Sequence, residues 1–248
     1  MLKNPRLRLG ATLWLLSMSG VVVLAFMVIP QLLARSAQQV PLSVALTASI
    51  VQSGVLLLLA VWAGVALSKP LGLGAPVIEA ALSGSEIWPV LRRQLVPAAI
   101  VGMIVGSQLA FSKFIAPAKI LAVIQTIELP IAAKVLYGGV TEEVLMRWGA
   151  MTAMIWLPWR LLQKKIGLPE VAYVIGAILV TAVLFGVGHL PATAAIGIEL
   201  TGSVVAYIII ANSVPGILFG FLYWRYGIEA AIIAHAGAHV VGLLATVT

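Results

Sequence analysis

The sequence predicts an all-α polytopic membrane protein with about seven or eight transmembrane helices. Of its 248 residues, 62% are hydrophobic and only 9% are charged, and the mean hydropathy is +1.12. Several apolar segments approach the ~20 residues that cross a bilayer as a helix. Backbone polar groups in lipid are satisfied only by helices or closed barrels, and these apolar runs are too long and continuous for barrel strands.

Seven apolar segments are expected to cross the membrane, separated by short stretches that carry charges or prolines. They cover about residues 9–34, 42–67, 95–111, 131–162, 171–189, 203–224 and 229–247. Residues 113–130 mix lysines and a glutamate with aliphatic residues, which is typical of an interfacial helix or of an eighth, protein-buried helix. A short interfacial helix is also expected around residues 77–82.

The net charge of +7 does not indicate nucleic-acid binding. The basic residues lie in short loops between apolar segments rather than on one face, which is the positive-inside pattern of membrane proteins. The chain has no cysteine, so disulfides, thiolate catalysis and cysteine-ligated metals are excluded. All eight acidic residues are glutamates. An intramembrane aspartyl dyad is therefore excluded, and any carboxylate chemistry must come from glutamate.

Three ionisable residues, Glu142, Glu143 and Arg147, lie inside the fourth apolar segment. Charges at membrane depth are costly and indicate a functional site. Glu143 and Arg147 are four residues apart, so they share a helix face and can neutralise each other. Glu142 points about 100° away from Glu143 and has no local cation, which leaves it free for chemistry. The alternative is that both glutamates only pair with Arg147 to hold helices together.

Two glycines, Gly138 and Gly139, come directly before this motif. We expect them to kink the helix, or to end one helix and begin the next. In the second case Thr141 would cap the new helix, and both glutamates would lie in its first turn, where negative charge is favourable.

All three histidines lie in the C-terminal half of the chain. His189 follows Phe185 by four residues, so the phenyl ring can pack against the imidazole. His235 and His239 are also four residues apart and share a helix face, and the small residues between them leave room for a ligand or another backbone. A lone buried histidine is usually hydrogen-bonded core, but three beside a free glutamate favour a functional site.

Glutamate and histidine together support two kinds of hydrolysis. In the first, Glu142 and His189 bind and deprotonate a water that attacks a peptide carbonyl. His235 and His239 then donate hydrogen bonds to the developing oxyanion. In the second, the same four residues ligate Zn²⁺, which activates the water. The His-Glu-x-x-His pattern of common zinc proteases is absent, so the metal alternative depends on spacing alone.

Three motifs, Glu-Glu-x-x-x-Arg, Phe-x-x-x-His and a histidine followed four residues later by a polar residue, resemble those of the CPBP family. These CAAX proteases and bacteriocin-processing enzymes are intramembrane glutamic endopeptidases, relatives of the Ras-converting CAAX endopeptidase. The resemblance covers about residues 138–241, and the first half of the chain matches only as generic membrane helices. Each motif is short, but the three in order on separate apolar helices are a strong combined signal.

The resemblance implies an intramembrane endopeptidase that hydrolyses membrane-associated or hydrophobic proteins and uses no cofactor. By motif position, Glu142 corresponds to the water-activating base and His189 to its partner. Glu143 and Arg147 correspond to the supporting pair, and His235 to an oxyanion donor.

One residue departs from the family pattern, because His239 stands where the family commonly has asparagine. A neutral histidine can donate a hydrogen bond as asparagine does. It also adds a metal-capable ligand and makes the oxyanion site sensitive to pH. Phe185, which opens the Phe-x-x-x-His motif, is the remaining supporting residue that the resemblance implies.

We expect one integral-membrane domain over residues 1–248. Residues 131–248 form the catalytic half that carries the motifs, and residues 1–130 contribute accessory transmembrane helices. The expected location is a multi-pass position in a prokaryotic plasma membrane. The expected partners are the lipid bilayer and a membrane-associated or hydrophobic peptide substrate, with no nucleic acid.

Two alternatives from other classes remain open. One is a non-catalytic membrane scaffold, such as a bacteriocin-immunity or sensor-type protein, that kept the fold and acts by binding partners. The other is a proton-coupled transporter, because Glu and His also build proton relays. Against the transporter, the sequence has no repeated half and no paired broken helices. Hydrolysis of a tagged membrane peptide and uptake driven by a pH gradient would separate these alternatives from a protease.

Overall fold

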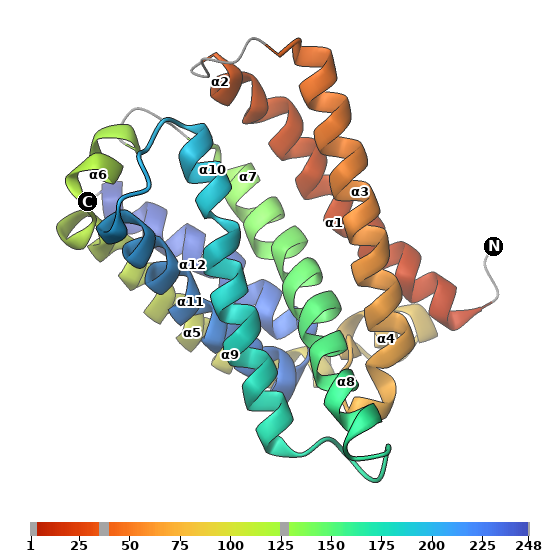
Figure 1. The fold of residues 1–248 in the computed structure, drawn as a ribbon. Coiled ribbons are helices and arrows are strands. Elements are labelled where there is room, and N and C mark those ends of the chain that lie inside the picture. The colour runs from red at the N-terminus through yellow and green to blue at the C-terminus, as the bar shows by residue number, and fades with distance from the viewer. Residues whose placement is uncertain (1–3, 35–39, 125–128, 248) are drawn as a thin grey trace.

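The computed structural model describes residues 4–34, 40–124 and 129–247, and every regular element within them is a helix (Figure 1). The first half contains α1 (Pro5–Met27), α2 (Ile29–Leu33), α3 (Leu42–Leu67), η1 (Lys69–Leu71), α4 (Pro76–Ser83), α5 (Trp88–Ile115) and α6 (Ala118–Ile124). The second half contains α7 (Ile131–Ala133), η2 (Lys134–Glu142), η3 (Val144–Met151), α8 (Thr152–Leu161), α9 (Val171–Gly188), α10 (Leu190–Ala195), α11 (Gly202–Tyr226) and α12 (Ile228–Val247). The prediction of an all-α protein is confirmed.

Six helices in these ranges are long and apolar enough to cross a membrane. They are Pro5–Leu33, Leu42–Leu67, Trp88–Ile115, Val171–Ala195, Gly202–Tyr226 and Ile228–Ala245. Elements α7, η2, η3 and α8 follow one another and form a further long helix over residues 131–161, drawn in green and termed the motif helix below (Figure 1). The structure thus agrees with the prediction of about seven or eight long membrane helices.

The ambiguous stretch 113–130 is divided between two helices. Its first residues end α5, and α6 covers only seven residues, while residues 125–128 lie outside the described ranges. A helix of seven residues is far too short to cross a bilayer, so α6 fits the interfacial alternative. The short helix expected around residues 77–82 corresponds to α4.

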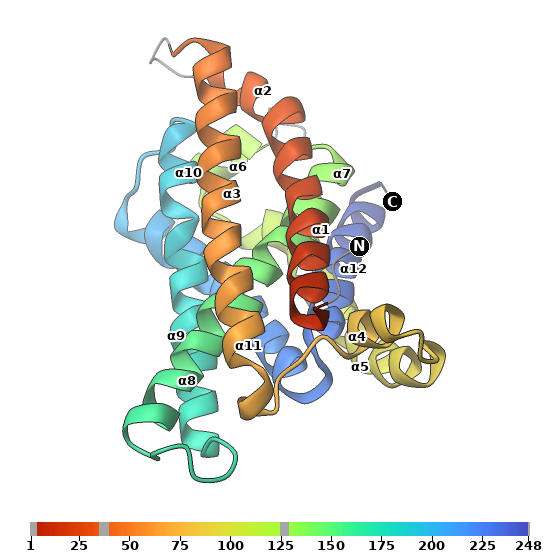
Figure 2. The same cartoon turned by 90° about the vertical axis from the view of Figure 1, so that its right-hand side faces the viewer.

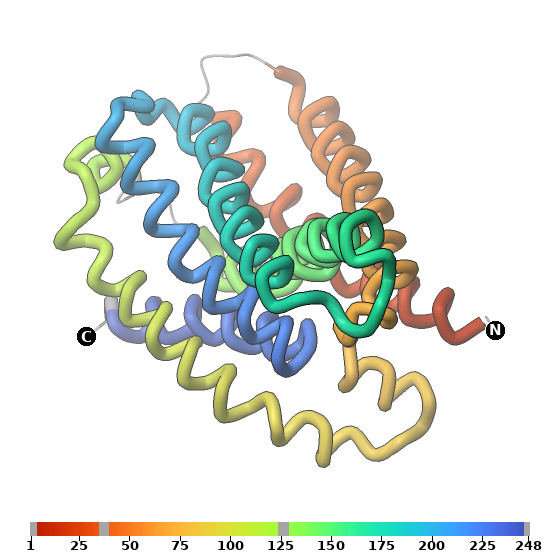
Figure 3. The backbone as a smooth tube through the Cα atoms, turned by 60° about the horizontal axis from the view of Figure 1, so that its bottom comes forward, coloured from red at the N-terminus to blue at the C-terminus, as the bar shows by residue number. Residues whose placement is uncertain are grey.

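The motif helix lies at the centre of the molecule. On one side it contacts α1 and α3, which run antiparallel to each other, and on the other side it contacts α9, α11 and α12. Helix α5 packs along α12 on the outside, as the turned views show (Figures 2 and 3). Helices from both halves of the sequence therefore surround the segment that carries the glutamates.

Small residues let the neighbouring helices approach the motif helix closely. A Cβ added to Gly149 would lie 2.5 Å from Cβ and 2.8 Å from Cα of Ala60 on α3. A Cβ added to Gly139 would lie 2.8 Å from Cβ of Ala236 on α12. Between helices in lipid, such close packing replaces the hydrophobic effect as a source of stability. The glycines of the motif helix are therefore packing positions for the helices on both sides.

The motif helix neither ends nor restarts at its glycine pair, 138–139. It widens instead, and Lys134–Glu142 and Val144–Met151 adopt π-helical geometry, in which bonds run between residues five apart. At the end of the second π-helical stretch, the Thr152 amide donates to the carbonyl of Arg147, five residues earlier. The second alternative, in which a new helix begins here and Thr141 caps it, is therefore excluded, and the Thr141 hydroxyl instead donates to the Ser17 carbonyl on α1 at 2.7 Å.

Glu229, at the start of α12, holds the short helix α4. Its Oε1 accepts hydrogen bonds from the amides of Val77 and Ile78, both at 2.9 Å. These are amides of the first turn of α4, which have no partner within that helix. Gly227 allows the sharp turn that leads into α12, since its φ of 105° is a conformation that favours glycine. Helix α4 is therefore fixed to α12 by a buried carboxyl group.

We expect Gly149→Ala to lower the thermal unfolding midpoint in detergent, because the new methyl group collides with the backbone and side chain of Ala60. Overpacking of this kind costs about 1–3 kcal/mol. Gly176→Ala is the matched control, since an added Cβ there meets no atom within 4 Å. A midpoint that is unchanged in Gly149→Ala would contradict the close α3 contact.

Candidate active site

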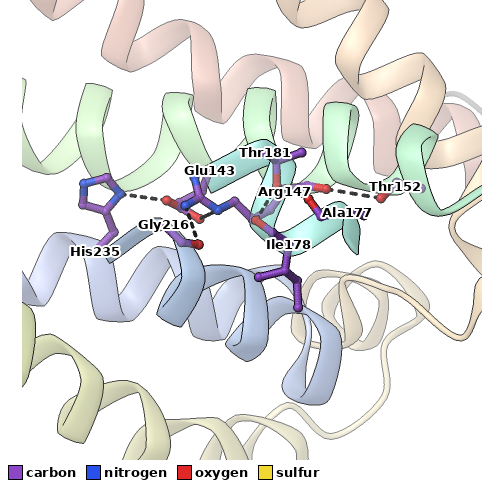
Figure 4. A network of polar contacts seen from close by, with 8 residues as sticks. All are labelled: Glu143, Arg147, Thr152, Ala177, Ile178, Thr181, Gly216 and His235. Atoms are coloured by element: carbon purple, nitrogen blue, oxygen red, sulfur yellow. Dashed lines mark hydrogen bonds and ion pairs between the residues drawn. The ribbon is translucent and has the colours of Figure 1, made fainter. Parts of the chain in front are cut away.

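The buried carboxylate of Glu143 joins the motif helix to α12 (Figure 4). Its Oε1 lies 2.8 Å from Nδ1 of His235, and its Oε2 lies 3.3 Å from Nε of Arg147. An ionised carboxylate only accepts hydrogen bonds, so Nδ1 of His235 carries the hydrogen when Glu143 is charged. The i, i+4 spacing indicated the contact with Arg147. The bond to His235, 92 residues away, gave no signal in the sequence.

Arg147 connects the motif helix to two further helices. Its side chain is 1% exposed, and its Nη2 donates to the carbonyl of Gly216 on α11 at 3.0 Å. The guanidinium carbon lies 5.0 Å from the ring centroid of Phe185 on α9 and 5.7 Å from that of Phe219 on α11. Aromatic faces stabilise a desolvated cation at such distances. Arg147 is thus held by charge, a hydrogen bond and two rings.

Glu142 differs from its neighbour, because it makes no ion pair or hydrogen bond with any residue that the structure describes. It is half-buried, and its electrostatic neighbours include His189 and His235. Tyr137, five residues earlier, also interacts with it electrostatically, since the wide turns of the helix bring residues five apart onto neighbouring turns. Among the described residues, the site therefore contains one carboxylate that is bonded to other side chains, Glu143, and one that is not, Glu142.

His189 lies directly after α9, and the last turn of that helix fixes its ring. Its Nδ1 lies 2.7 Å from the carbonyl oxygen of Phe185, and the two rings meet edge to face with centroids 4.7 Å apart. A carbonyl oxygen can only accept, so Nδ1 is the protonated nitrogen. The neutral ring then has Nε2 free as an acceptor. The packing of Phe185 on the imidazole is the arrangement that their spacing indicated.

His235 and His239 stack on each other on α12, with ring centroids 5.0 Å apart. His235 also stacks on Phe219, at 4.6 Å. The position of a Cβ on Gly138 would lie 2.7 Å from Nε2 of His239 and 3.5 Å from Nε2 of His235. Both Nε2 atoms therefore face the space that the missing side chain of Gly138 leaves.

Sequence reasoning missed four contributors to this site. Gly138 makes room for the two histidines, Gly216 supplies a carbonyl to Arg147, Phe219 stacks on His235, and Tyr137 lies near Glu142. The glycine pair was a visible signal, but it indicated a break rather than a close approach. The other three act across helices, and their spacing in the sequence carries no information about those contacts.

The metal alternative requires at least three ligating side chains around one point. Within residues 4–34, 40–124 and 129–247, no group of three or more His, Cys, Asp or Glu side chains is arranged to hold a metal ion. His235 and His239 come together, but Nδ1 of His235 is already bound to Glu143. As the side chains lie, they form a hydrogen-bonded carboxylate and histidine site.

Fold and site together define a polytopic membrane protein with two glutamates, an arginine and three histidines gathered from three helices. The model of the Rce1-like family, described as type II CAAX prenyl endopeptidase Rce1-like, matches residues 125–241. Residues 125–241 are therefore similar to the Rce1-like family, and the resemblance that the three motifs indicated is confirmed. No curated protein and no solved structure matches the chain.

We expect Arg147→Met to destabilise the fold by about 3–5 kcal/mol, because it leaves the buried charge of Glu143 without its cation. The measurement is the thermal unfolding midpoint in detergent. Arg160→Met, at an exposed position near the end of α8, is the control for loss of a surface arginine. Equal midpoints for the two variants would show that the Arg147 contacts contribute nothing to stability.

Proposed function

We propose that this protein is an intramembrane endopeptidase of the glutamic type, in which Glu142 and His189 activate a water that attacks a peptide bond. One observation carries the proposal. Glu143 is bound by Arg147 and His235, whereas the adjacent Glu142 has no bonded partner in the described part of the chain. A membrane protein that needed only a structural ion pair would not keep a second, unpaired carboxylate beside it.

The first step is the removal of a proton from water. The carbonyl of Phe185 occupies Nδ1 of His189, so Nε2 can accept one hydrogen of the water and orient it. The carboxylate of Glu142 takes the other hydrogen as a general base. The water oxygen then forms a bond to the carbonyl carbon of the substrate, and the electron pair of the C=O bond moves onto its oxygen.

The second requirement is a set of donors for that oxyanion. Nε2 of His235 and Nε2 of His239 face the space above Gly138, where two converging donors would stabilise negative charge. His235 can donate through Nε2 only when the Glu143–His235 pair holds two protons, since Nδ1 takes one of them.

The reaction ends when the tetrahedral intermediate collapses. The electron pair on the oxyanion re-forms the C=O bond, and the C–N bond breaks. The leaving amine takes the proton that Glu142 removed from water, which returns Glu142 to its ionised form. The products are a new carboxyl terminus and a new amino terminus.

The rest of the chain supports this centre in the proposal. Glu143, Arg147 and Phe185 orient the histidines, and residues 131–248 form the catalytic half. Residues 1–130 form the accessory transmembrane helices, of which α1 and α3 brace the motif helix. The whole chain acts as a single integral-membrane domain.

The proposed substrates are membrane-associated or hydrophobic proteins. The family description names CAAX prenyl endopeptidases, which supports a substrate held at the membrane by a lipid or an apolar segment. Substrate would reach the site from the lipid bilayer, and the proposed location is a prokaryotic plasma membrane. Nucleic acid has no part in this function.

The proposed reaction uses no cofactor, so we expect peptide hydrolysis by the purified protein to be the same with and without EDTA. The alternative is a zinc-dependent protease that uses Glu142, His189, His235 and His239 as ligands. In that case the chelator would abolish hydrolysis and added Zn²⁺ would restore it. The measurement is the cleavage rate of a membrane peptide before chelation, after chelation and after metal is returned.

We expect Glu142→Gln and His189→Ala each to lower the cleavage rate by at least about 100-fold, the usual contribution of a general base. Thermal unfolding of both variants should match that of the wild type, because neither side chain bridges helices. Glu86→Gln, at an exposed position, is the control for loss of a carboxylate and should retain full activity. Retained cleavage in either site variant would remove the roles assigned to these residues.

The test of function in the cell compares the N- and C-termini of membrane proteins between cells that carry the wild type and cells that carry Glu142→Gln. Termini that are present with the wild type and absent with Glu142→Gln identify the substrates. Identical termini under several growth conditions would favour the membrane scaffold, which binds partners without cutting them.

A further inference from the structure

Lys134 is a charged residue of the motif helix that the proposed reaction does not use. It lies in η2, four residues before Gly138, and residues four apart on a helix are neighbours on its surface. Its ammonium group interacts electrostatically with the ring of His239. Lys134 therefore lies about one turn beyond the space into which the two histidines point.

The site contains an acidic group and a cation with different electrostatic neighbours. Glu142 interacts with Tyr137, and Lys134 interacts with His239. An anionic group on a bound peptide is attracted to Lys134 and repelled by the carboxylate of Glu142. The site can therefore orient a peptide that carries a negative charge near the bond to be cut.

Lys134 also differs from the other lysines of this region. Lys113 and Lys119 are exposed, and Lys119 pairs with Glu199. Lys134 is half-buried, and no carboxylate among the described residues lies within ion-pair distance of it. A lysine that only extended to the aqueous interface would be exposed. A partly buried cation without a carboxylate partner indicates a functional role.

We propose that Lys134 binds the C-terminal carboxylate of the peptide substrate, on the leaving-group side of the cleaved bond. This inference rests on the peptidase activity proposed above. An ammonium group and a carboxylate form a strong, charge-assisted hydrogen bond. The CAAX motif in the family description is the C-terminal end of a protein. A substrate of that kind therefore brings a free carboxylate close to the bond that is cut.

The test uses one probe in two forms, a farnesylated peptide that ends in Cys-aliphatic-aliphatic-Ser, made as the free acid and as the C-terminal amide. The quantity measured is the acid-to-amide ratio of kcat/KM. We expect the wild type to prefer the acid. In Lys134→Met this ratio should fall about tenfold or more, the factor expected for a hydrogen bond between charged groups. Lys134→Arg keeps the cation and should retain a preference for the acid, and Lys113→Met is the control for an exposed lysine.

Two outcomes would overturn this role of Lys134. The wild type could cleave acid and amide equally well, which already excludes a carboxylate subsite whatever the variants do. Alternatively, Lys134→Met could slow both forms by the same factor, which would assign Lys134 to stability or to the oxyanion. Failure of the peptidase proposal gives a different result, because the wild type would then cleave neither form.

Discussion

The site depends on one buried carboxylate, that of Glu143, held between the guanidinium of Arg147 and the imidazole of His235. A charge in a membrane interior is tolerated only when it is paired and hydrogen-bonded. Here the pairing uses groups from different helices, and Arg147 extends the network to the carbonyl of Gly216. The motif helix, α11 and α12 therefore keep their mutual positions as long as this charge is satisfied. Glu142 is oriented by the same constraint, because it is the residue directly before Glu143 on the backbone that this charge anchors.

Close packing of backbones is the second condition. The network can form only if α12 approaches the motif helix closely, and Gly139 against Ala236 permits that approach. The wide turns of the motif helix contribute as well, since π-helical segments change which residues share a face and occur often at functional sites. Gly138 combines both effects, because it gives room on the same face to His235 and His239. The cost of two glycines within a helix is offset by contacts that no larger residue could make.

The features of this structure that depend on local spacing or on long apolar runs could be predicted from the sequence. Membrane helices follow from composition, and the contact between Glu143 and Arg147 follows from a spacing of four residues. The bond from Glu143 to His235 could not be predicted, since it depends on how two distant helices cross. The same reason applies to the alternative in which Thr141 caps a new helix. Sequence position suggested a local partner for its hydroxyl, but in the fold the hydroxyl donates to the carbonyl of Ser17 on α1.

The attachment of α4 to Glu229 links the movements of two helices. The carboxyl group of Glu229 satisfies two amides at the start of α4, so α4 cannot move away from α12 without leaving a buried polar group and two helix amides unbonded. Glu229 and His235 belong to the same helix, about 9 Å apart along its axis. A displacement of α4 is therefore transmitted through this attachment to the helix that carries the histidine pair.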